Sequence, residues 1–132
     1  MTSPLRRVLA VDDDPDILMV VRMALENVGG LTVACCGSGR EALGVAPGFA
    51  PDLVLLDVMM PDLDGPATLK ALRGLPGLGG VAAVFLTAKV QPDEVTRYRE
   101  AGIADVVTKP FDPMTLAATL RRIWDRVQGG GS

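Results

Sequence analysis

Short apolar runs alternate with longer amphipathic segments along the whole chain. The apolar runs occupy residues 8–11, 31–36, 53–56, 81–86 and 104–108. Nearly continuous runs of this length are typical of strands in a parallel sheet, which is covered on both faces. Because a segment with helix signals follows each run, the pattern predicts five β–α units joined by right-handed crossovers.

The segments between the runs predict helices. In the first segment, apolar side chains recur at helical spacing and stop at Gly29-Gly30; they are Ile17, Val20, Val21, Ala24, Leu25 and Val28. The second segment opens with the capping-box spacing of Ser38 and Glu41. Prolines, acidic first turns and glycines place the later helices at residues 38–48, 66–74, 92–102 and 112–127.

The length and composition fit one globular domain. We expect the domain to span residues 1–128 and a flexible Gly/Ser tail to span 129–132. The formal net charge of −3 argues against a chain that binds nucleic acid, because phosphate backbones require a basic face. No apolar run approaches the length of a membrane span and no signal peptide is recognisable, so we expect a cytoplasmic protein.

The chain contains no histidine, which excludes much of catalytic chemistry. Nucleophile pairs that use histidine, and histidine general bases, cannot form within this chain. The two cysteines, Cys35 and Cys36, are adjacent on a predicted strand, where neighbours point to opposite faces. We therefore expect neither a disulfide nor a zinc site, and we interpret both as small apolar residues.

Polar side chains follow four of the five predicted strands at the point where each ends. They are Asp12, Asp13 and Asp14 after the first strand, Asp57 after the third, Thr87 after the fourth and Lys109 after the fifth. The carboxyl ends of parallel strands form the edge at which such sheets bind ligands. Crowded carboxylates raise one another's pKa, and a hard cation with oxygen ligands removes that cost, so the cluster indicates a Mg²⁺ site.

Four stretches of the chain resemble the receiver domain of bacterial two-component response regulators, of the single-domain type related to chemotaxis regulators. They are VLAVDDDPDI (8–17), LVLLDVMMPDLDG (53–65), VFLTAK (84–89) and ADVVTKPFDP (104–113). Together they extend from the first strand to the last helix. The resemblance implies a flavodoxin-like α/β fold, a doubly wound parallel five-stranded (βα)₅ sheet with strand order 2-1-3-4-5.

The resemblance also implies roles for the acidic residues. Asp57 stands where the family keeps its phosphoacceptor, a carboxylate that attacks phosphorus and forms an acyl phosphate. Asp12 and Asp13 match the acidic pair that holds Mg²⁺, with Asp57 and the backbone carbonyl of Met59 as further ligands. Asp14 has no such counterpart, and we interpret it as the N-cap of the first helix.

Two further residues match family positions that bind the phosphoryl group. Thr87 matches the hydroxyl that hydrogen-bonds a phosphoryl oxygen, and Lys109 matches the lysine that pairs with the group. The resemblance implies a cis peptide bond between Lys109 and Pro110, since X-Pro bonds tolerate the cis form. Mg²⁺, the ammonium and the hydroxyl would together stabilise charge during phosphoryl transfer.

The implied function is that of a phosphoacceptor signalling domain rather than an enzyme with its own substrate. Since the chain has no histidine, the phosphohistidine donor must belong to a sensor histidine kinase or a histidine phosphotransfer protein. The output would be an altered surface that binds an unidentified protein target. No output domain follows, so we expect no direct contact with nucleic acid and none with a membrane.

The chain departs from the family pattern at Val106. Many receivers carry Tyr or Phe at this place, three residues before the lysine, and that ring moves inward as the hydroxyl shifts toward the phosphoryl group. The sequence suggests no substitute ring, because the one tyrosine is Tyr98 and no phenylalanine lies on the fifth strand. The hypothesis is that Asp57 is phosphorylated but that the output does not use the usual aromatic switch.

Other side chains are candidates for controlling the access of water to the site and for docking a partner protein. The resemblance places Met59 and Lys89 at the mouth of the site, where they would limit the approach of attacking water. On the first helix, Leu18, Met19 and Met23 fall outside the predicted core stripe and would form an exposed apolar patch, on a helix against which receivers often dock their phosphodonor. Packing against the last helix is the alternative for these three residues.

Two rival functions remain open at this point. A haloacid-dehalogenase-like phosphohydrolase also uses an aspartate at a strand end, but that class has a second aspartate where Met59 stands here. A degenerate receiver that serves only as an interaction module is the other rival. The complete set of matching residues argues against it, and Val106 keeps it open.

Overall fold

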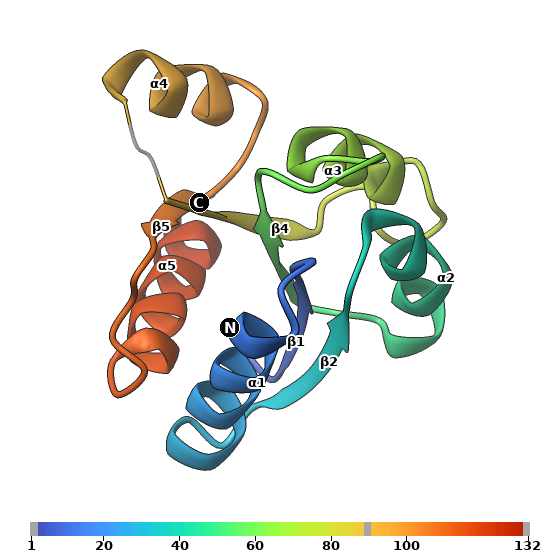
Figure 1. The fold of residues 1–132 in the computed structure, drawn as a ribbon. Helices are drawn as coiled ribbons and strands as arrows, with labels where there is room; N and C mark the ends of the chain where they lie inside the picture. Colours follow the sequence, from blue (N-terminus) through green and yellow to red (C-terminus); the bar gives the residue numbers. More distant parts are fainter. Residues whose placement is uncertain (1–2, 89–90, 131–132) are drawn as a thin grey trace.

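Five parallel strands form one sheet with helices on both faces in the computed structural model, which describes residues 3–88 and 91–130 (Figure 1). The strands are β1 (Arg7–Val11), β2 (Thr32–Cys36), β3 (Leu53–Asp57), β4 (Ala82–Thr87) and β5 (Asp105–Thr108). Their order in the sheet is β2-β1-β3-β4-β5. The predicted flavodoxin-like fold is therefore confirmed, and each apolar run became a strand with nearly the predicted limits.

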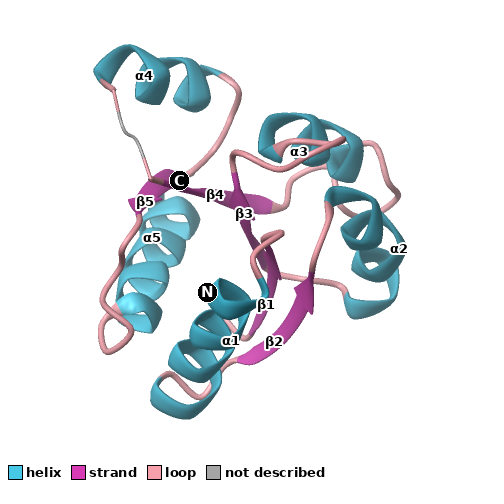
Figure 2. Cartoon of the chain, viewed as in Figure 1, coloured by secondary structure: helices cyan, strands magenta, loops and turns pink. Residues whose placement is uncertain are grey.

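The helices are α1 (Pro15–Met23), which continues into the π-helical turn η1 (Ala24–Val28), α2 (Gly39–Phe49), α3 (Gly65–Arg73), α4 (Pro92–Glu100) and α5 (Leu116–Gly130). Helices α1, α2, α3 and α5 lie in two layers, and α4 stands further from the sheet (Figure 2). Helices α1 and α5 pack with η1 on one face of the sheet, and α2 and α3 pack on the other. Strand side chains alternate between the two cores, so Cys35 and Cys36 face opposite layers, as predicted, and both are free thiols.

Side-chain N-caps stabilise the first turns of the helices where the sequence predicted them. The carboxylate of Asp14 accepts a hydrogen bond from the Asp16 backbone N–H at 2.9 Å, which confirms the N-cap of α1. The hydroxyl of Ser38 accepts from the Glu41 N–H at 3.1 Å, and the Glu41 carboxylate accepts from the Gly37 N–H at 2.6 Å. The first bond satisfies a backbone donor that α2 itself leaves unpaired, and the second holds the chain just before the N-cap.

Helix α2 does not stop at Pro47-Gly48 but continues to Phe49. Burial of the helix end explains the extra length, because Phe49 packs against the core of the α2 and α3 layer, and the Arg7 guanidinium lies 4.4 Å from the centre of its ring. Ala50 then takes a left-handed conformation, with φ of 54°, and its N–H bonds to the Ala46 carbonyl. Tertiary packing thus outweighs the helix-breaking tendency of the Pro-Gly pair.

The predicted core stripe of the first helix was wrong at two positions. Val20 and Val28 are 36% and 48% exposed, whereas Val21 and Leu25 are fully buried. Val28 lies at the end of the π-helical turn, whose wider spacing departs from the 3.6-residue period used to predict the stripe. Leu18, which was expected outside the stripe, is half-buried against the core.

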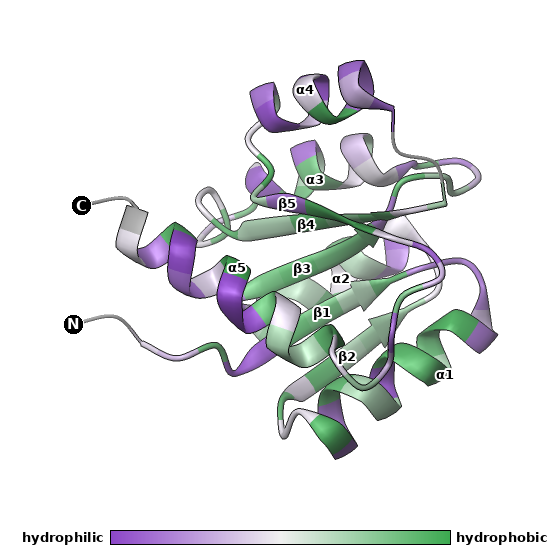
Figure 3. Cartoon of the chain, turned by 90° about the vertical axis from the view of Figure 1, so that its left-hand side faces the viewer, coloured by the Kyte–Doolittle hydropathy of each residue, from purple (hydrophilic) through white to green (hydrophobic). Residues whose placement is uncertain are grey.

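Met19 and Met23 do lie on the exposed side of α1, as predicted. With the exposed Val20 they give this helix an apolar outer surface, visible as green segments in Figure 3.

The N-terminal segment contacts the last helix in the part of the chain that the structure describes. Helix α5 passes the expected domain end at residue 128 and reaches Gly130. The indole N–H of Trp124 on this helix donates to the Ser3 carbonyl at 2.8 Å, which fastens the N-terminal segment. Within residues 3–88 and 91–130, no helix is both long enough and apolar enough to cross a membrane.

Candidate functional site

The polar residues predicted at the strand ends meet at the carboxyl edge of the sheet. Asp12 directly follows β1, Asp57 is the last residue of β3, Thr87 is the last residue of β4, and Lys109 directly follows β5. Asp12, Asp57 and Thr87 are buried, and they are three of the four buried polar or charged residues that the structure describes. Parallel pairing brings them together, because Asp57 lies in register with Leu86, the neighbour of Thr87.

Lys109 is the cation that compensates the buried carboxylates. Its ammonium nitrogen lies 2.8 Å from Oδ2 of Asp12 and 3.2 Å from Oδ1 of Asp57. The Lys109 backbone N–H donates to the Thr87 carbonyl at 2.8 Å, so the end of β4 holds the start of the loop that carries the ammonium. The peptide bond between Lys109 and Pro110 is cis, as the resemblance implied.

The charges at this edge perturb one another. Burial, and after it the negative charge of Asp12, raises the pKa of Asp57 from its ordinary value of 3.8 to about 6, against the opposing effect of Lys109. Burial acts to lower the pKa of Lys109, but the hydrogen bonds and charges of Asp12 and Asp57 outweigh it, so this pKa is raised. The site therefore keeps a firmly charged ammonium beside a carboxylate that ionises at a higher pH than an ordinary aspartate.

The acidic residues fit a metal ion. One carboxylate oxygen each from Asp12, Asp13 and Asp57 lie within 4.8 Å of one another. Oδ2 of Asp12 is buried and lies 2.8 Å from the Lys109 ammonium. Three carboxylates this close together are the oxygen donor set that a hard divalent cation prefers. The cluster could thus hold a metal ion.

Two backbone contributions to this site were not predicted. The N–H of Asp14 donates to Oδ1 of Asp12 at 2.9 Å and so orients the carboxylate that pairs with Lys109. Gly65 opens α3 directly behind Asp57, and a Cβ added there would lie 2.6 Å from the Asp57 carbonyl oxygen. The only sign of this close approach in the sequence was the position of Gly65 between Asp64 and Pro66, where the loop meets the helix.

Met59 lies beside a cavity that borders the site. Its side chain is 79% exposed, in accord with a place at the mouth. The cavity has a volume of about 420 Å³ and is lined by Val58, Met59, Thr87, Ala88, Glu94, Arg97 and Tyr98. Lys89, the other residue predicted at the mouth, lies outside the described residues.

The structure brings an aromatic ring close to Val106, although the sequence suggested none. Val106 is half-buried on β5 and lies in register with Phe85 of β4. The ring of Tyr98, from α4, packs edge-on against Phe85 with the ring centres 5.0 Å apart. Tyr98 was missed because it is eight residues from Val106 and reaches the same place from another element.

Comparison with known proteins agrees with this geometry. The model of the family described as "Response regulator receiver domain" matches residues 8–121. The chain belongs to the response regulator receiver domain family. It is a receiver of the two-component type, and membership accords with a phosphoacceptor signalling domain.

Curated relatives of this receiver are longer proteins. It is 38% identical over 121 residues to the DNA-binding response regulator MtrA of Mycolicibacterium smegmatis, covering 92% of this chain and 51% of that protein. It is 37% identical over 126 residues to the transcriptional regulatory protein PrrA of Mycobacterium tuberculosis, covering 96% and 52%. The receiver thus spans about half the length of these relatives.

A solved structure of similar size gives the same fold. The chemotaxis protein CheY4 of Vibrio cholerae superposes with a TM-score of 0.84 at 33% identity, covering 90% of this receiver and 98% of that chain. The likeness therefore extends over nearly the whole of both chains and agrees with the strand order found here.

Proposed function

We propose that this receiver accepts a phosphoryl group on Asp57 from a phosphohistidine of a sensor histidine kinase or histidine phosphotransfer protein. The observation that carries the proposal is the placement of Asp57. It is a buried carboxylate at the end of β3, 3.2 Å from the ammonium of Lys109 and beside two further carboxylates. A charge in this position is costly for the fold, and chemistry at the carboxylate explains why it is there.

The carboxylate of Asp57 acts as nucleophile. One of its oxygens attacks phosphorus, and the new P–O bond forms as the P–N bond to the donor histidine breaks, leaving the electron pair on the imidazole nitrogen. A pKa of about 6 leaves Asp57 mostly ionised at neutral pH, as attack requires. Because the chain contains no histidine, the donor comes from the partner.

The neighbouring residues stabilise charge during the transfer. Lys109 already pairs with Asp57 and would follow the charge onto a phosphoryl oxygen, and the Thr87 hydroxyl would donate to another. Mg²⁺, held by Asp12, Asp13, Asp57 and the backbone carbonyl of Met59, would neutralise the carboxylates and the phosphoryl oxygens. The phosphorylated receiver then signals through an altered surface to a protein target, and we propose no direct contact of these residues with nucleic acid.

Intact-mass measurement tests this proposal. The protein is incubated with Mg²⁺ and acetyl phosphate beside an Asp57→Asn variant and a sample in which EDTA removes the metal. We expect one phosphoryl adduct per chain in the native protein with Mg²⁺, and none in the variant or without the metal.

The same experiment distinguishes the rival functions. Rapid turnover of varied phosphate esters without a stable adduct would indicate a phosphohydrolase of the haloacid-dehalogenase type. The absence of both adduct and turnover would indicate a degenerate receiver that acts only by binding a partner.

A further inference from the structure

The guanidinium of Arg73 is a half-buried cation at the end of α3. Its nitrogens donate to the backbone carbonyls of Ala101, Gly102 and Val81 at 3.2, 2.8 and 3.1 Å. Its Nε atom is buried and has no hydrogen-bond partner among the described residues. The ion pairs of the described residues do not include Arg73, so no carboxylate offsets its charge there. Burial therefore lowers the pKa of Arg73 below its ordinary value.

The three carbonyls hold the guanidinium in one place. Val81 directly precedes β4, and Ala101 and Gly102 lie between α4 and β5. Gly102 has a φ of 90°, and a Cβ added there would lie 2.9 Å from Nη1 of Arg73. The glycine thus permits a close approach of the guanidinium to the backbone. A ligand that binds to Arg73 would therefore lose little free energy to the ordering of this side chain.

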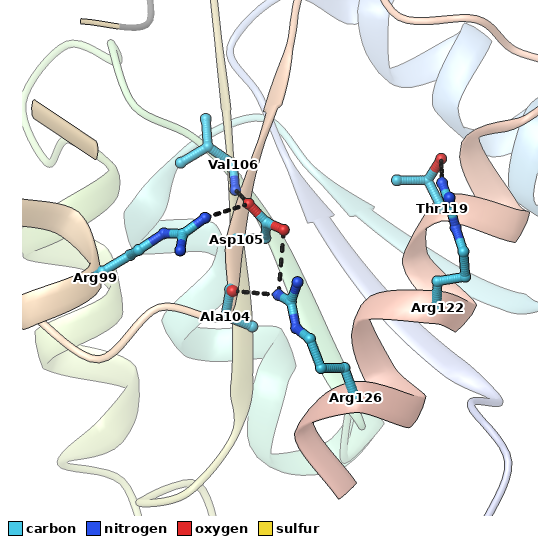
Figure 4. A network of polar contacts seen from close by, with 7 residues as sticks. All are labelled: Arg99, Ala104, Asp105, Val106, Thr119, Arg122 and Arg126. Carbon is cyan, nitrogen blue, oxygen red and sulfur yellow. Dashed lines mark hydrogen bonds and ion pairs between the residues drawn. The ribbon is translucent and has the colours of Figure 1, made fainter. Parts of the chain in front are cut away.

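Two arginines beside the same loop do have an anionic partner. Nη2 of Arg99 lies 3.5 Å from Oδ1 of Asp105, and Nη2 of Arg126 lies 3.1 Å from Oδ2 of the same carboxylate (Figure 4). Arg99 and Arg126 are exposed to water, which screens their charge, whereas Arg73 is half-buried. Of these three arginines, the one without a carboxylate is therefore the one furthest removed from water, where an unpaired charge costs most.

Arg73 also lines a cavity between α3, β4 and the end of α4. The cavity has a volume of about 340 Å³ and is lined by Pro66, Leu69, Lys70, Arg73, Phe85 and Ala101. This volume falls within the range of small-molecule sites, about 300–1,000 Å³. Lys70 lies one turn before Arg73 on α3, is exposed, and forms no ion pair within the described chain. The described lining thus offers two uncompensated cations, no acidic group and an otherwise apolar surface.

We propose that this cavity binds a small carboxylate with an apolar body. The carboxylate accepts hydrogen bonds from the guanidinium of Arg73, its Nε–H included, and pairs with the ammonium of Lys70. The apolar body packs over Leu69 and Phe85, where it is removed from water. None of the residues proposed to act with Asp57 lines this cavity, so the inference does not rest on the proposed function.

A titration with phenylbutyrate tests the site. Phenylbutanamide is the matched ligand control, because it has the same apolar body but no charge. Two-dimensional ¹H–¹⁵N NMR spectra follow the backbone amides and the arginine Nε–H groups during each titration. We expect phenylbutyrate to bind roughly tenfold more tightly than the amide and to shift the Nε–H resonance of Arg73. No binding, equal affinities of the two compounds, an unmoved Arg73 resonance or tighter binding of inorganic phosphate would overturn the proposal.

Variants locate the binding in this cavity. Lys70→Gln removes one of the two cations from an exposed side chain, and we expect it to weaken phenylbutyrate binding roughly threefold to fivefold. Arg6→Gln is the matched control, because Arg6 is also exposed and does not line the cavity, and its affinity should equal that of the native protein. Arg73→Gln should weaken binding roughly tenfold or more.

Folding is measured in parallel, because Arg73→Gln also loses its bonds to three carbonyls. Urea denaturation shows whether this variant folds, and Lys70→Gln decides the outcome where it does not. An unchanged affinity in Lys70→Gln, or an equal loss of affinity in Arg6→Gln, would overturn the proposal.

Discussion

The carboxylate of Asp57 ends a strand whose other residues are all apolar and buried, and one ammonium partly offsets its charge. The ammonium of Lys109 forms ion pairs with both Asp57 and Asp12, two carboxylates that would otherwise repel each other. Met59, two residues after Asp57, is 79% exposed. We propose that access of water to a phosphorylated Asp57 depends on the side chain at this position.

Replacement of Met59 by asparagine should shorten the life of the phosphoryl group. On this proposal the apolar side chain restricts water near Asp57, whereas an amide would orient an attacking water by hydrogen bonding. We expect loss of phosphate to accelerate roughly threefold to tenfold, equivalent to about 1 kcal/mol in the barrier. The measurement is the decay of the adduct mass after the phosphodonor is removed. Met23→Asn, at an exposed methionine on α1, is the control, and an unchanged decay in Met59→Asn would contradict the role.

At the scale of elements, the junction of β3 and α3 determines how Asp57 is presented. The backbone N–H of Gly65 donates to the Val58 carbonyl at 3.0 Å, so the first residue of α3 rests directly on the chain that follows Asp57. A Cβ at Gly65 would lie 2.9 Å from Val58 Cα, and neither backbone segment can yield as a side chain would. The glycine permits this close approach.

The change Gly65→Ala should therefore destabilise the fold and slow phosphorylation of Asp57. We expect a loss of about 1–3 kcal/mol in the free energy of unfolding, as for other overpacking changes, measured by urea denaturation. Gly44→Ala is the matched control, because Gly44 lies exposed inside α2 and an added Cβ meets nothing within 4 Å. That variant should gain up to about 1 kcal/mol through helix propensity. Equal effects of the two substitutions would contradict the close approach.

At the scale of the whole molecule, two apolar cores enclose the sheet and leave one polar edge. Burying the charge of Asp57 at that edge costs free energy, so the stability of the entire fold depends on pH. Because the pKa of Asp57 is about 6 when folded and 3.8 ordinarily, the folded chain retains a proton that the unfolded chain releases between these values. In the absence of metal, this group therefore makes stability fall as pH rises from about 4 to about 6.

Asp57→Asn should remove this pH dependence. We expect the metal-free variant to be more stable than the native protein above pH 6, by on the order of 1–3 kcal/mol, since it buries no charge at that position. Thermal unfolding across pH 4–8 measures the difference. Addition of Mg²⁺ should raise the unfolding temperature of the native protein more than that of the variant. A parallel pH profile for the two proteins would contradict the raised pKa of Asp57.

The sequence by itself determined the five β–α units, the strand limits and the residues at the strand ends. These features follow from local periodicity, and parallel strands necessarily bring their carboxyl ends, with Asp12, Asp57, Thr87 and Lys109, to one edge. The tertiary structure decided that Tyr98 packs on Phe85, that Gly65 rests behind Asp57 and that Val20 is exposed. These features depend on distances between elements remote in the chain, and no local pattern of residues encodes such distances.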